Sequence, residues 1–322
     1  MKKYLTIVAV AIFIASCSSD TEINKATNRV PIELGTSMQV TATRSNDQTL
    51  QATELVAGQT AGVYVYYTGA KAKASGVTYG YQNKSYAATG TSGDLALASG
   101  ETTPYYPEDK SKAVDIYVYS PRVSTLSGEL SAQTAVAFNT AADQTSAANY
   151  QNSDFVWGVK ENVTTTASAV EVPLIHKLSK INVNIAAGTG VALSSLKGAS
   201  ITLADVNLAG TANLTTGAVS TTGSTTSTLT FTTATADPTG TFVSNTSTSC
   251  YTASAIIIPQ TITSKDLTIT LSNGSTYKYS LSKAFAASTS YTFDITVNAS
   301  GLSLTTTISD WTSGGTTTGT AE

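Results

Sequence analysis

The sequence has little charge. Charged residues make up 12% of its 322 residues, and the formal net charge is −3. This share is about half of that in an ordinary globular protein. Lysines and arginines form no block along the chain, whereas binding of nucleic acid needs clustered basic side chains that contact phosphates. We therefore expect no nucleic acid among the partners of this protein.

Histidine and cysteine are almost absent, which restricts the possible chemistry. His176 is the only histidine, so no cluster of histidines can bind a metal, and a catalytic triad would depend on this one residue. We expect His176 to make a structural hydrogen bond within a strand. Of the two cysteines, Cys17 and Cys250, the second lies between Ser249 and Tyr251, which offer no base or cation to activate a thiol. Cys250 is therefore predicted to be a half-buried structural residue.

Motifs of other catalytic and ligand sites are missing as well. Carboxylates such as Glu108, Asp109 and Asp154 have no spacing that is typical of an acid–base pair or a calcium loop. The glycines fall at turns and form no loop that would cradle a phosphate. We predict that the chain has no catalytic residue, no metal site and no cofactor, and that it is not an enzyme.

Alternation of residues with a period of two recurs along the chain, whereas helical periodicity is hard to find. Clear examples lie at residues 63–66, 114–119, 181–185, 201–203, 267–271 and 291–297. Most of these segments have one apolar face, as the strands of antiparallel sheets do. Asn273-Gly274 follows one such segment and gives the clearest signal of a β-hairpin. Many short strands separated by turns predict an all-β chain of β-sandwich domains.

Composition divides the chain into two parts. Twelve of the 16 tyrosines precede residue 151, and a threonine-rich tract covers residues 211–248. This shift predicts an N-terminal domain at residues 45–170 and a C-terminal domain at residues 171–322. The tract is either a disordered stalk or, as its spaced apolar residues favour, a series of polar strands and loops. The tyrosines either pack as good strand formers, which we favour, or display rings that bind sugars or a receptor.

The start of the chain has the parts of an export signal. Two lysines precede an apolar run at residues 5–14, which is too short for the roughly 20 residues that cross a bilayer as a helix. Ile14-Ala15-Ser16-Cys17 then resembles the lipobox of bacterial lipoproteins. The resemblance implies that residues 1–16 are a signal peptide and that Cys17 carries acyl chains such as palmitate, which anchor the protein in the outer membrane at the cell surface. No intramolecular disulfide is then expected. The alternative is an ordinary secretory signal that contains a cysteine.

Several short motifs follow one another in a characteristic order. They are Thr103-Pro104-Tyr105-Tyr106-Pro107, Asp154-Phe155-Val156-Trp157-Gly158, His176-Lys177-Leu178-Ser179-Lys180, Ile258-Pro259-Gln260-Thr261 and Ile308-Ser309-Asp310-Trp311. No single motif is specific, but the ordered set covers nearly the whole chain and resembles bacterial fimbrillins, the subunits of type V pili of Gram-negative anaerobes. The resemblance implies two tandem transthyretin-like β-sandwich domains and assembly with other fimbrial subunits into a homo- or hetero-polymer.

The same resemblance implies a maturation route. An arginine- or trypsin-like protease removes the N-terminal segment of the surface lipoprotein and with it the first strand of the N-terminal domain. A strand from a neighbouring subunit fills the open groove, and this donor-strand exchange extends the fibre. Strand physics agrees, because an exposed sheet edge over an uncovered core is a template for another strand. Head-to-tail addition of this kind gives an open filament.

The positions of the arginines restrict the site of the cut. The chain has three, Arg29, Arg44 and Arg122. Arg122 lies inside the N-terminal domain, and Arg29 precedes a segment that alternates like a strand, so that only a cut after Arg44 would release the lipid together with that strand. We predict cleavage between Arg44 and Ser45, which makes residues 17–44 a tether and a removable first strand. The alternative is a plain surface arginine in an uncut lipoprotein.

The leading hypothesis is a structural subunit, stalk or tip, of a type V fimbria with a role in adhesion. The alternative is a non-polymerising surface lipoprotein that binds glycan or another ligand with the same scaffold, and a surface hydrolase is a distant third. The place in the fibre depends on the segment with Leu302, Leu304 and Ile308, which is either a donor strand or the domain's own last strand. In the second case the protein would be a tip or accessory subunit.

Overall fold

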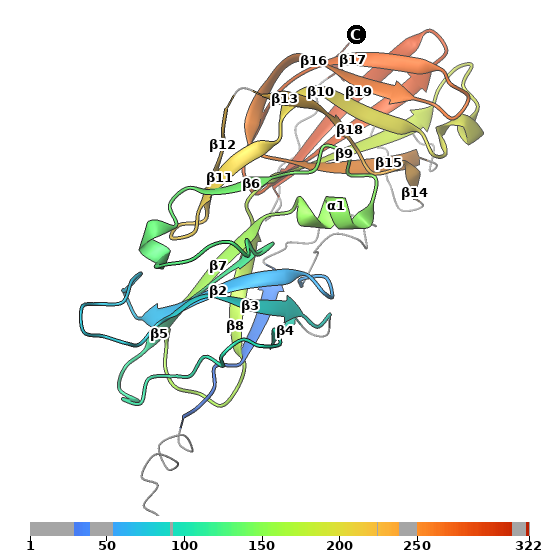
Figure 1. Ribbon diagram of the computed structural model, residues 1–322. Helices are drawn as coiled ribbons and strands as arrows, with labels where there is room; N and C mark the ends of the chain where they lie inside the picture. The colour runs from blue at the N-terminus through green and yellow to red at the C-terminus, as the bar shows by residue number, and fades with distance from the viewer. Residues whose placement is uncertain are drawn as a thin grey trace, which may run out of the picture.

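Strands make up most of the structure. The computed structural model describes residues 29–38, 54–90, 93–223, 225–237, 250–310 and 320–321. Within these residues the chain forms β-strands in four sheets, a short α-helix and 3-10 helices, which confirms the predicted all-β class. No helix in this part of the chain is long and apolar enough to cross a membrane. The sheets form an elongated molecule with one sheet at its lower end in the view of Figure 1.

The first core is a closed barrel of seven strands at that end (Figure 1). In the order of the sheet, the strands are β1 (Leu34–Met38), β4 (Asp94–Leu97), β3 (Tyr81–Ala88), β2 (Thr60–Tyr67), β5 (Val114–Ser120), β7 (Val156–Val163) and β8 (Val170–His176). The alternation predicted at residues 63–66 and 114–119 falls in β2 and β5. Because side chains alternate between the two faces of a strand, the aliphatic residues of these strands pack in the barrel core and most of their tyrosines pack on the opposite face.

The second core lies between two sheets that form a β-sandwich at the other end of the molecule. One sheet contains β13 (Thr226–Thr230), β10 (Ser200–Asn207), β16 (Gln260–Thr270) and β17 (Thr276–Phe285). The other contains β14 (Thr235–Asp237), β15 (Cys250–Ile257), β9 (Ser179–Ala187), β18 (Thr289–Asn298), β19 (Gly301–Asp310) and β20 (Thr320–Ala321). Asn273 and Gly274 lie in the turn from β16 to β17, where Gly274 has a φ of +87°, and this confirms the predicted hairpin.

A small sheet and the α-helix lie between barrel and sandwich (Figure 1). The small sheet consists of β6 (Val136–Asn139), β11 (Ala209–Asn213) and β12 (Ala218–Thr221), α1 spans Ala147–Asn152, and 3-10 helices span Leu130–Ala132 and Leu193–Leu196. β6 comes from the first half of the chain and pairs with β11 of the second half. Sequence periodicity missed α1 because its six residues make less than two turns. Its start is fixed by Ser146, whose hydroxyl accepts a hydrogen bond from the Asn149 N–H at 3.2 Å.

Two features bear on the expected pair of sandwiches. The first core is a barrel rather than an open sandwich, because β1 pairs with β8 on one side and with β4 on the other. The second is the connection between the two units: β8 of the barrel ends at His176, and β9 of the sandwich begins at Ser179, while the domain boundary at residues 170 and 171 stays a prediction. The described part of the threonine-rich tract forms strands, among them β12 and β13, as we predicted against a disordered stalk.

Candidate functional site

The first strand of the barrel and the gap that it fills are the candidate functional site. β1 runs parallel to β8 with five residue pairs, and it runs antiparallel to β4 with two. The contact with β8 begins just before the strand, where the Val170 N–H donates to the Glu33 carbonyl at 2.8 Å. A segment from the start of the chain thus lies between two strands that come much later in the sequence. Its removal would leave a groove with two unpaired sheet edges.

Side chains of this segment reach the barrel core. Ile32 and Leu34 are each 3% exposed, and Met38 is 7% exposed. Thr36 is also buried, and its N–H and its hydroxyl both donate to the carbonyl of Gly93, at 2.8 and 3.0 Å. Burial of each of the three large apolar side chains contributes about 1.5–3 kcal/mol. The segment is a structural part of the barrel, and without it the groove would expose an apolar lining.

Gly93 allows β1 to approach β4 closely. It has a φ of +74°, and a Cβ atom at this position would overlap the carbonyl oxygen of Thr36. Glycine is therefore required both by the backbone conformation and by the space. Any larger residue would displace β1 or the turn before β4. Nothing in the sequence around Gly93 indicated this contact, because the two segments are far apart in the chain.

The residues just before β1 pack on the motif at residues 103–107. The Ile32 N–H donates to the Pro104 carbonyl at 2.9 Å. The Tyr106 N–H donates to the Val30 carbonyl, also at 2.9 Å. This motif carried part of the family resemblance, but its contact with the first segment of the chain appears only in the tertiary structure. The segment that fills the groove therefore extends from Val30 to Met38.

Both arginines in the part of the chain that the structure describes donate hydrogen bonds from their side chains. Arg29 Nη2 lies 2.8 Å from Glu108 Oε1, and this hydrogen bond raises the pKa of the exposed Arg29 side chain. Arg122 donates from Nε and Nη2 to the Asn83 carbonyl, at 3.1 and 3.0 Å. Arg29 is also followed directly by the packed segment that begins at Val30. The chain is therefore hydrogen-bonded directly after Arg29, at Val30, and at Arg122 itself, whose N–H donates to the Thr60 carbonyl at 3.1 Å.

The predicted processing residues lie outside the described residues. These are Cys17, Arg44 and Ser45. The described chain ends at Met38 and begins again at Glu54, so the predicted cut falls between β1 and the rest of the barrel. Lipidation and cleavage at these residues stay predictions.

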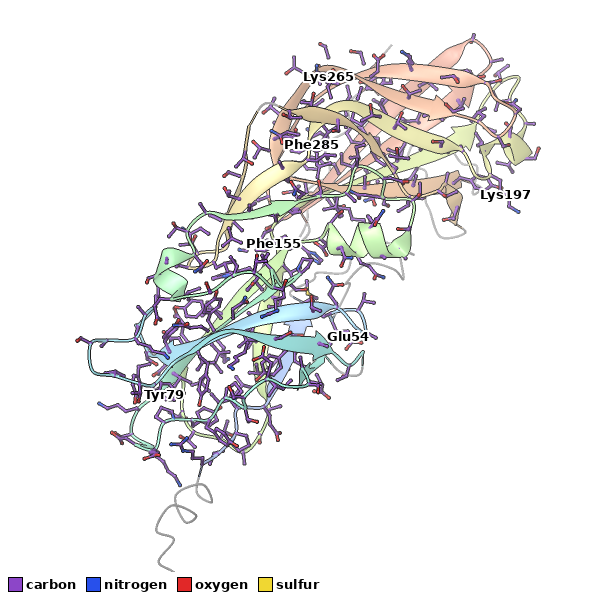
Figure 2. The ribbon with its side chains drawn as sticks, viewed as in Figure 1. Glu54, Tyr79, Phe155, Lys197, Lys265 and Phe285 are labelled. Atoms are coloured by element: carbon purple, nitrogen blue, oxygen red, sulfur yellow. The ribbon has the colours of Figure 1, made fainter. Side chains whose placement is uncertain are left out.

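An aromatic cluster joins the barrel to the rest of the molecule. It contains Tyr64, Tyr66, Tyr117, Tyr119, Leu130, Val136, Tyr150, Phe155, Trp157, Leu178, Ala212, Leu214, Ile256 and Ile258. Trp157 donates from Nε1 to the Leu214 carbonyl at 2.8 Å, and Lys177 Nζ lies 5.0 Å from the centre of its ring. Phe155, which stacks on Phe138 of β6, marks this region in Figure 2. For these tyrosines the predicted packing role is confirmed.

A second group of tyrosines lies at the outer end of the barrel, where Figure 2 labels Tyr79. The ring centres of Tyr67 and Tyr79 are 4.7 Å apart, and those of Tyr79 and Tyr81 are 5.7 Å apart. The Tyr79 hydroxyl donates to the Tyr105 carbonyl at 3.0 Å, and burial raises its pKa. These rings contact one another, so they form a packed group rather than a row of open faces.

The candidate catalytic residues have structural environments. His176 Nδ1 lies 2.9 Å from the Asp154 carboxylate, and both side chains are buried, which confirms the structural hydrogen bond expected for His176. Cys250 is 2% exposed rather than half-buried, because it packs on Ala186 of the neighbouring strand. Within the described residues, no group of three or more His, Cys, Asp and Glu could bind a metal ion.

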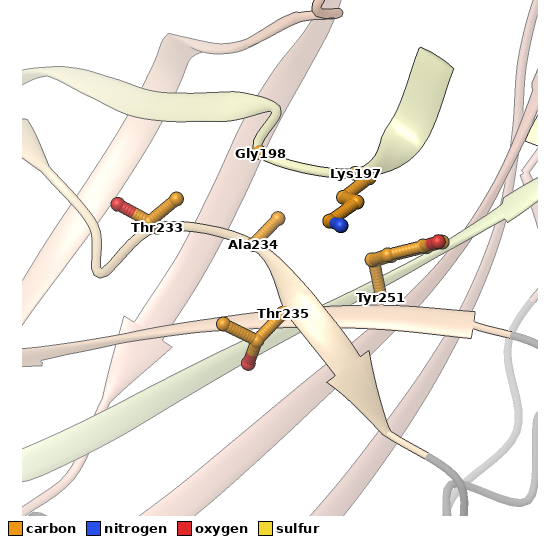
Figure 3. Close-up of a pocket in the computed structure, with 6 residues that line it drawn as sticks. All are labelled: Lys197, Gly198, Thr233, Ala234, Thr235 and Tyr251. Atoms are coloured by element: carbon orange, nitrogen blue, oxygen red, sulfur yellow. The ribbon is translucent and has the colours of Figure 1, made fainter. Parts of the chain in front are cut away.

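A hollow of about 360 Å³ lies at the far end of the sandwich, between the Lys197–Gly198 turn and β14 (Figure 3). Thr233, Ala234, Thr235 and Tyr251 complete its lining. The lining has no carboxylate, imidazole or thiol that could act as a base beside the hydroxyl groups of Thr233, Thr235 and Tyr251. The hollow is therefore a weaker candidate than the β1 groove.

Sequence comparison relates the whole chain to fimbrial proteins. The family described as Fimbrillin-like matches residues 41–311. A candidate fimbrium subunit of Bacteroides uniformis, Fim1C, is 28% identical over 340 residues, and the match covers 100% of both chains. The family match begins after β1 and spans the rest of the barrel and the sandwich as far as β19.

Structure comparison gives similar folds. A candidate cell adhesion protein from Bacteroides uniformis has a TM-score of 0.62 and 23% sequence identity, with 88% of this chain and 98% of that chain covered. Another, from Bacteroides ovatus, has a TM-score of 0.65 and 20% identity, with 88% and 99% covered. Both likenesses concern the fold, and they extend over barrel and sandwich together.

Proposed function

The chain belongs to the fimbrillin-like family, and on this premise we propose that it matures from a lipoprotein into a fimbrial subunit by exchange of its first strand. The family consists of structural and adhesion proteins, so the chain is not an enzyme. As a fimbrial subunit it is located in fimbriae at the cell surface and associates with other fimbrial subunits. The lipid on Cys17, the cut between Arg44 and Ser45 and the exchange itself are the steps that we propose.

The observation that carries this proposal is the position of β1. It closes the barrel, yet it is joined to the rest of the chain only through the segment that contains Arg44. After a cut there, the segment from Val30 to Met38 would be held without a covalent link, by the seven residue pairs of β1, by its hydrogen bonds to Gly93, Pro104 and Tyr106 and by three large buried side chains. A strand from another subunit that restores the same pairs and the same burial would replace it. Loss of β1 would also turn the barrel into an open sheet, as in the transthyretin-like sandwich that we propose for the mature domain.

The choice of Arg44 is supported by the surroundings of the other two arginines. A protease needs several residues of accessible, extended chain around the bond that it cuts. Arg29 is followed by residues that are hydrogen-bonded to Pro104 and Tyr106, and the side chain of Arg122 donates to the Asn83 carbonyl of β3. The family resemblance implies an arginine- or trypsin-like protease, which would find these two sites blocked.

The last strand of the sandwich bears on the place in the fibre. β19 pairs with β18 through ten residue pairs, and Leu304 is 6% exposed in the sandwich core. The segment with Leu302 and Ile308 is thus used by its own domain in this structure. We propose a tip or accessory subunit, which receives a strand and does not donate one. A stalk subunit would have to release β19.

The test is exchange of a labelled strand into the protease-treated protein. Trypsin should release the N-terminal fragment and leave Ser45 as the new N-terminus, and a fluorescent peptide of residues 30–38 should then enter the groove. Arg44→Ala should block both results, whereas the matched variant Arg29→Ala should block neither. A trimmed protein that takes up no peptide would contradict the proposal and favour a non-polymerising ligand-binding lipoprotein.

The same samples address the place in the fibre and the anchor. A ladder of SDS-resistant oligomers after trypsin would assign a stalk subunit, and uptake of peptide without a ladder would assign a tip or accessory subunit. Mass spectrometry of fimbriae extracted from the cell surface should find the subunit without Cys17. Lipidated Cys17 in every assembled subunit would contradict release by cleavage.

A further inference from the structure

We propose that the strand that replaces β1 carries a lysine or arginine at the position of Gly35, and that this cation selects the partner. The inference rests on the proposed strand exchange and concerns which strand fits the groove. It starts from the residues on both sides of Gly35. Gly35 pairs with Asp94 of β4 and with Glu171 of β8, so each neighbouring strand places one carboxylate beside it.

Both carboxylates lie close to the space above Gly35. A Cβ atom built on Gly35 would lie 2.7 Å from Glu171 Oε2 and 3.8 Å from Asp94 Oδ1. Neither carboxylate forms an ion pair with any residue that the structure describes. In β1, the position between the two carboxylates is occupied by Gly35, which has neither a side chain nor a charge.

A longer side chain can occupy this position. The backbone of Gly35 is in an ordinary strand conformation, which any L-residue adopts. The nearest obstacle is the end of the flexible Glu171 side chain, which can turn aside. Opposite charges on neighbouring strands stabilise a sheet, and like charges destabilise it. The groove therefore favours a basic residue here and disfavours an acidic one.

Gly35 makes β1 less stable in the groove, whereas a basic residue at this position would make a strand more stable. Glycine weakens a strand, because it has no side chain to pack and loses more backbone freedom on ordering than other residues. Gly35 thus makes β1 a weaker occupant than a strand with a cation at the same position. The difference gives the incoming strand an advantage that does not depend on apolar burial.

The charge preference also bears on the identity of the partner. The last strand of this chain, Gly301–Asp310, contains no lysine or arginine and ends in an aspartate. It could not place a cation between Asp94 and Glu171 in any register. The groove therefore fits a strand from a different subunit better than the last strand of a second copy of this chain.

The first experiment compares peptides of residues 30–38 that carry Gly35→Lys, Gly35→Gln or Gly35→Glu, added to trypsin-treated protein. Two exposed cross-strand ion pairs should make the lysine peptide bind about 3- to 10-fold more tightly than the glutamine peptide. The ratio should shrink in about 1 M salt and should be lost in the Asp94→Asn, Glu171→Gln double variant. Equal binding of the lysine and glutamine peptides would overturn the inference. Uptake of the unmodified peptide reports separately on whether the groove opens.

A second experiment needs no cleavage and keeps the inference testable if no peptide enters. In the full uncut chain, Gly35→Lys should melt at a higher temperature than Gly35→Gln, by about 1–3 °C. The difference should disappear when Asp94→Asn and Glu171→Gln are both present. A lysine variant that is no more stable than the glutamine variant would refute the charge preference, whatever the outcome of strand exchange.

Discussion

The barrel and the sandwich each contain a pair of parallel strands, and the two pairs are built differently. In the sandwich, β9 and β18 pair through nine residues in the middle of a six-stranded sheet. In the barrel, β1 and β8 pair through five residues, and β1 adds only two pairs with β4. The sandwich pair is thus fixed by long neighbours on both sides. The barrel pair depends on a short strand that a longer competitor could displace.

The polar side chains also distinguish the two pairs of parallel strands. In the sandwich, Asn184 of β9 donates from Nδ2 to Asp294 of β18 at 2.7 Å, and the buried carboxylate is satisfied across the pair. In the barrel, Gly35 offers nothing to the carboxylates of Asp94 and Glu171. β9 and β18 are thus joined by a side-chain hydrogen bond to a buried carboxylate, whereas the two carboxylates beside β1 are exposed to solvent.

The largest expected effect comes from core leucines of the two units. Leu34→Ala in β1 and Leu203→Ala in β10 remove side chains that are 3% and 0% exposed, and each should lower the free energy of unfolding of the uncut protein by about 2–5 kcal/mol. After cleavage and exchange only Leu203→Ala should still lower it, because β1 has left. Urea unfolding before and after exchange measures both values. A persistent effect of Leu34→Ala would show that β1 stays in the mature protein.

A smaller effect is expected from two glycines with similar backbone conformations. Gly93 and Gly274 have φ values of +74° and +87°, but a Cβ atom at Gly93 would overlap Thr36, whereas at Gly274 it would meet no atom within 4 Å. Gly274→Ala should destabilise the sandwich by about 1 kcal/mol through the backbone alone. Gly93→Ala should destabilise the barrel by about 2–3 kcal/mol, since β1 must also shift.

Amide hydrogen exchange shows which strands are destabilised by the Gly93→Ala substitution. In Gly93→Ala the Val170 N–H, which donates to Glu33, should exchange faster than in the parent protein, while amides of β9 should not change. Equal destabilisation by the two glycine variants would contradict the close contact between Gly93 and β1.

Alkaline pH should destabilise the aromatic cluster that joins the barrel to the rest of the molecule. Burial raises the pKa of Tyr64 and of Tyr117 to about 12, compared with about 10 for an unfolded tyrosine. Because the folded-state pKa is raised, the contribution to stability is complete below about pH 10 and is lost as the pH rises toward 12. Melting curves between these pH values, followed by the absorbance of ionised tyrosine, measure the loss.

Tyr64→Phe is the matched control for this pH dependence. No hydrogen-bond partner for the Tyr64 hydroxyl exists within the described residues, so its removal should not destabilise the protein, and it should flatten the alkaline decline. A steeper decline in Tyr64→Phe would rule out burial of this hydroxyl as its cause.

The smallest effect is expected at the exposed ion pair before β1. Arg29 and Glu108 are 48% and 68% exposed, so water and salt screen their attraction. Arg29→Gln should change the melting temperature by no more than about 1 °C and should leave cleavage after Arg44 intact. A large drop in melting temperature would mean that this ion pair, rather than the apolar side chains of β1, holds the first segment in place.

The strands of the barrel and of the sandwich were predicted from the sequence more completely than the contacts between them. Residues 114–119 and 291–297 alternate because each strand must cover a core, and the structure has strands there. The contact between His176 and Asp154 was expected only as an unspecified structural hydrogen bond. Gly93 carried no signal at all, because its requirement comes from Thr36, which lies in another strand.

The all-β class, the hairpin at Asn273-Gly274 and the lack of catalytic motifs follow from the sequence alone, since these depend on residues that are near one another in the chain. That the first strand closes a barrel between β4 and β8, and that Gly35 lies between Asp94 and Glu171, became visible in the folded structure. The difference arises because some features depend on neighbouring residues in the chain and others on residues that are far apart in it. A period of two is set by the backbone of each strand, whereas the choice and register of its neighbours is set by burial and pairing across the whole domain.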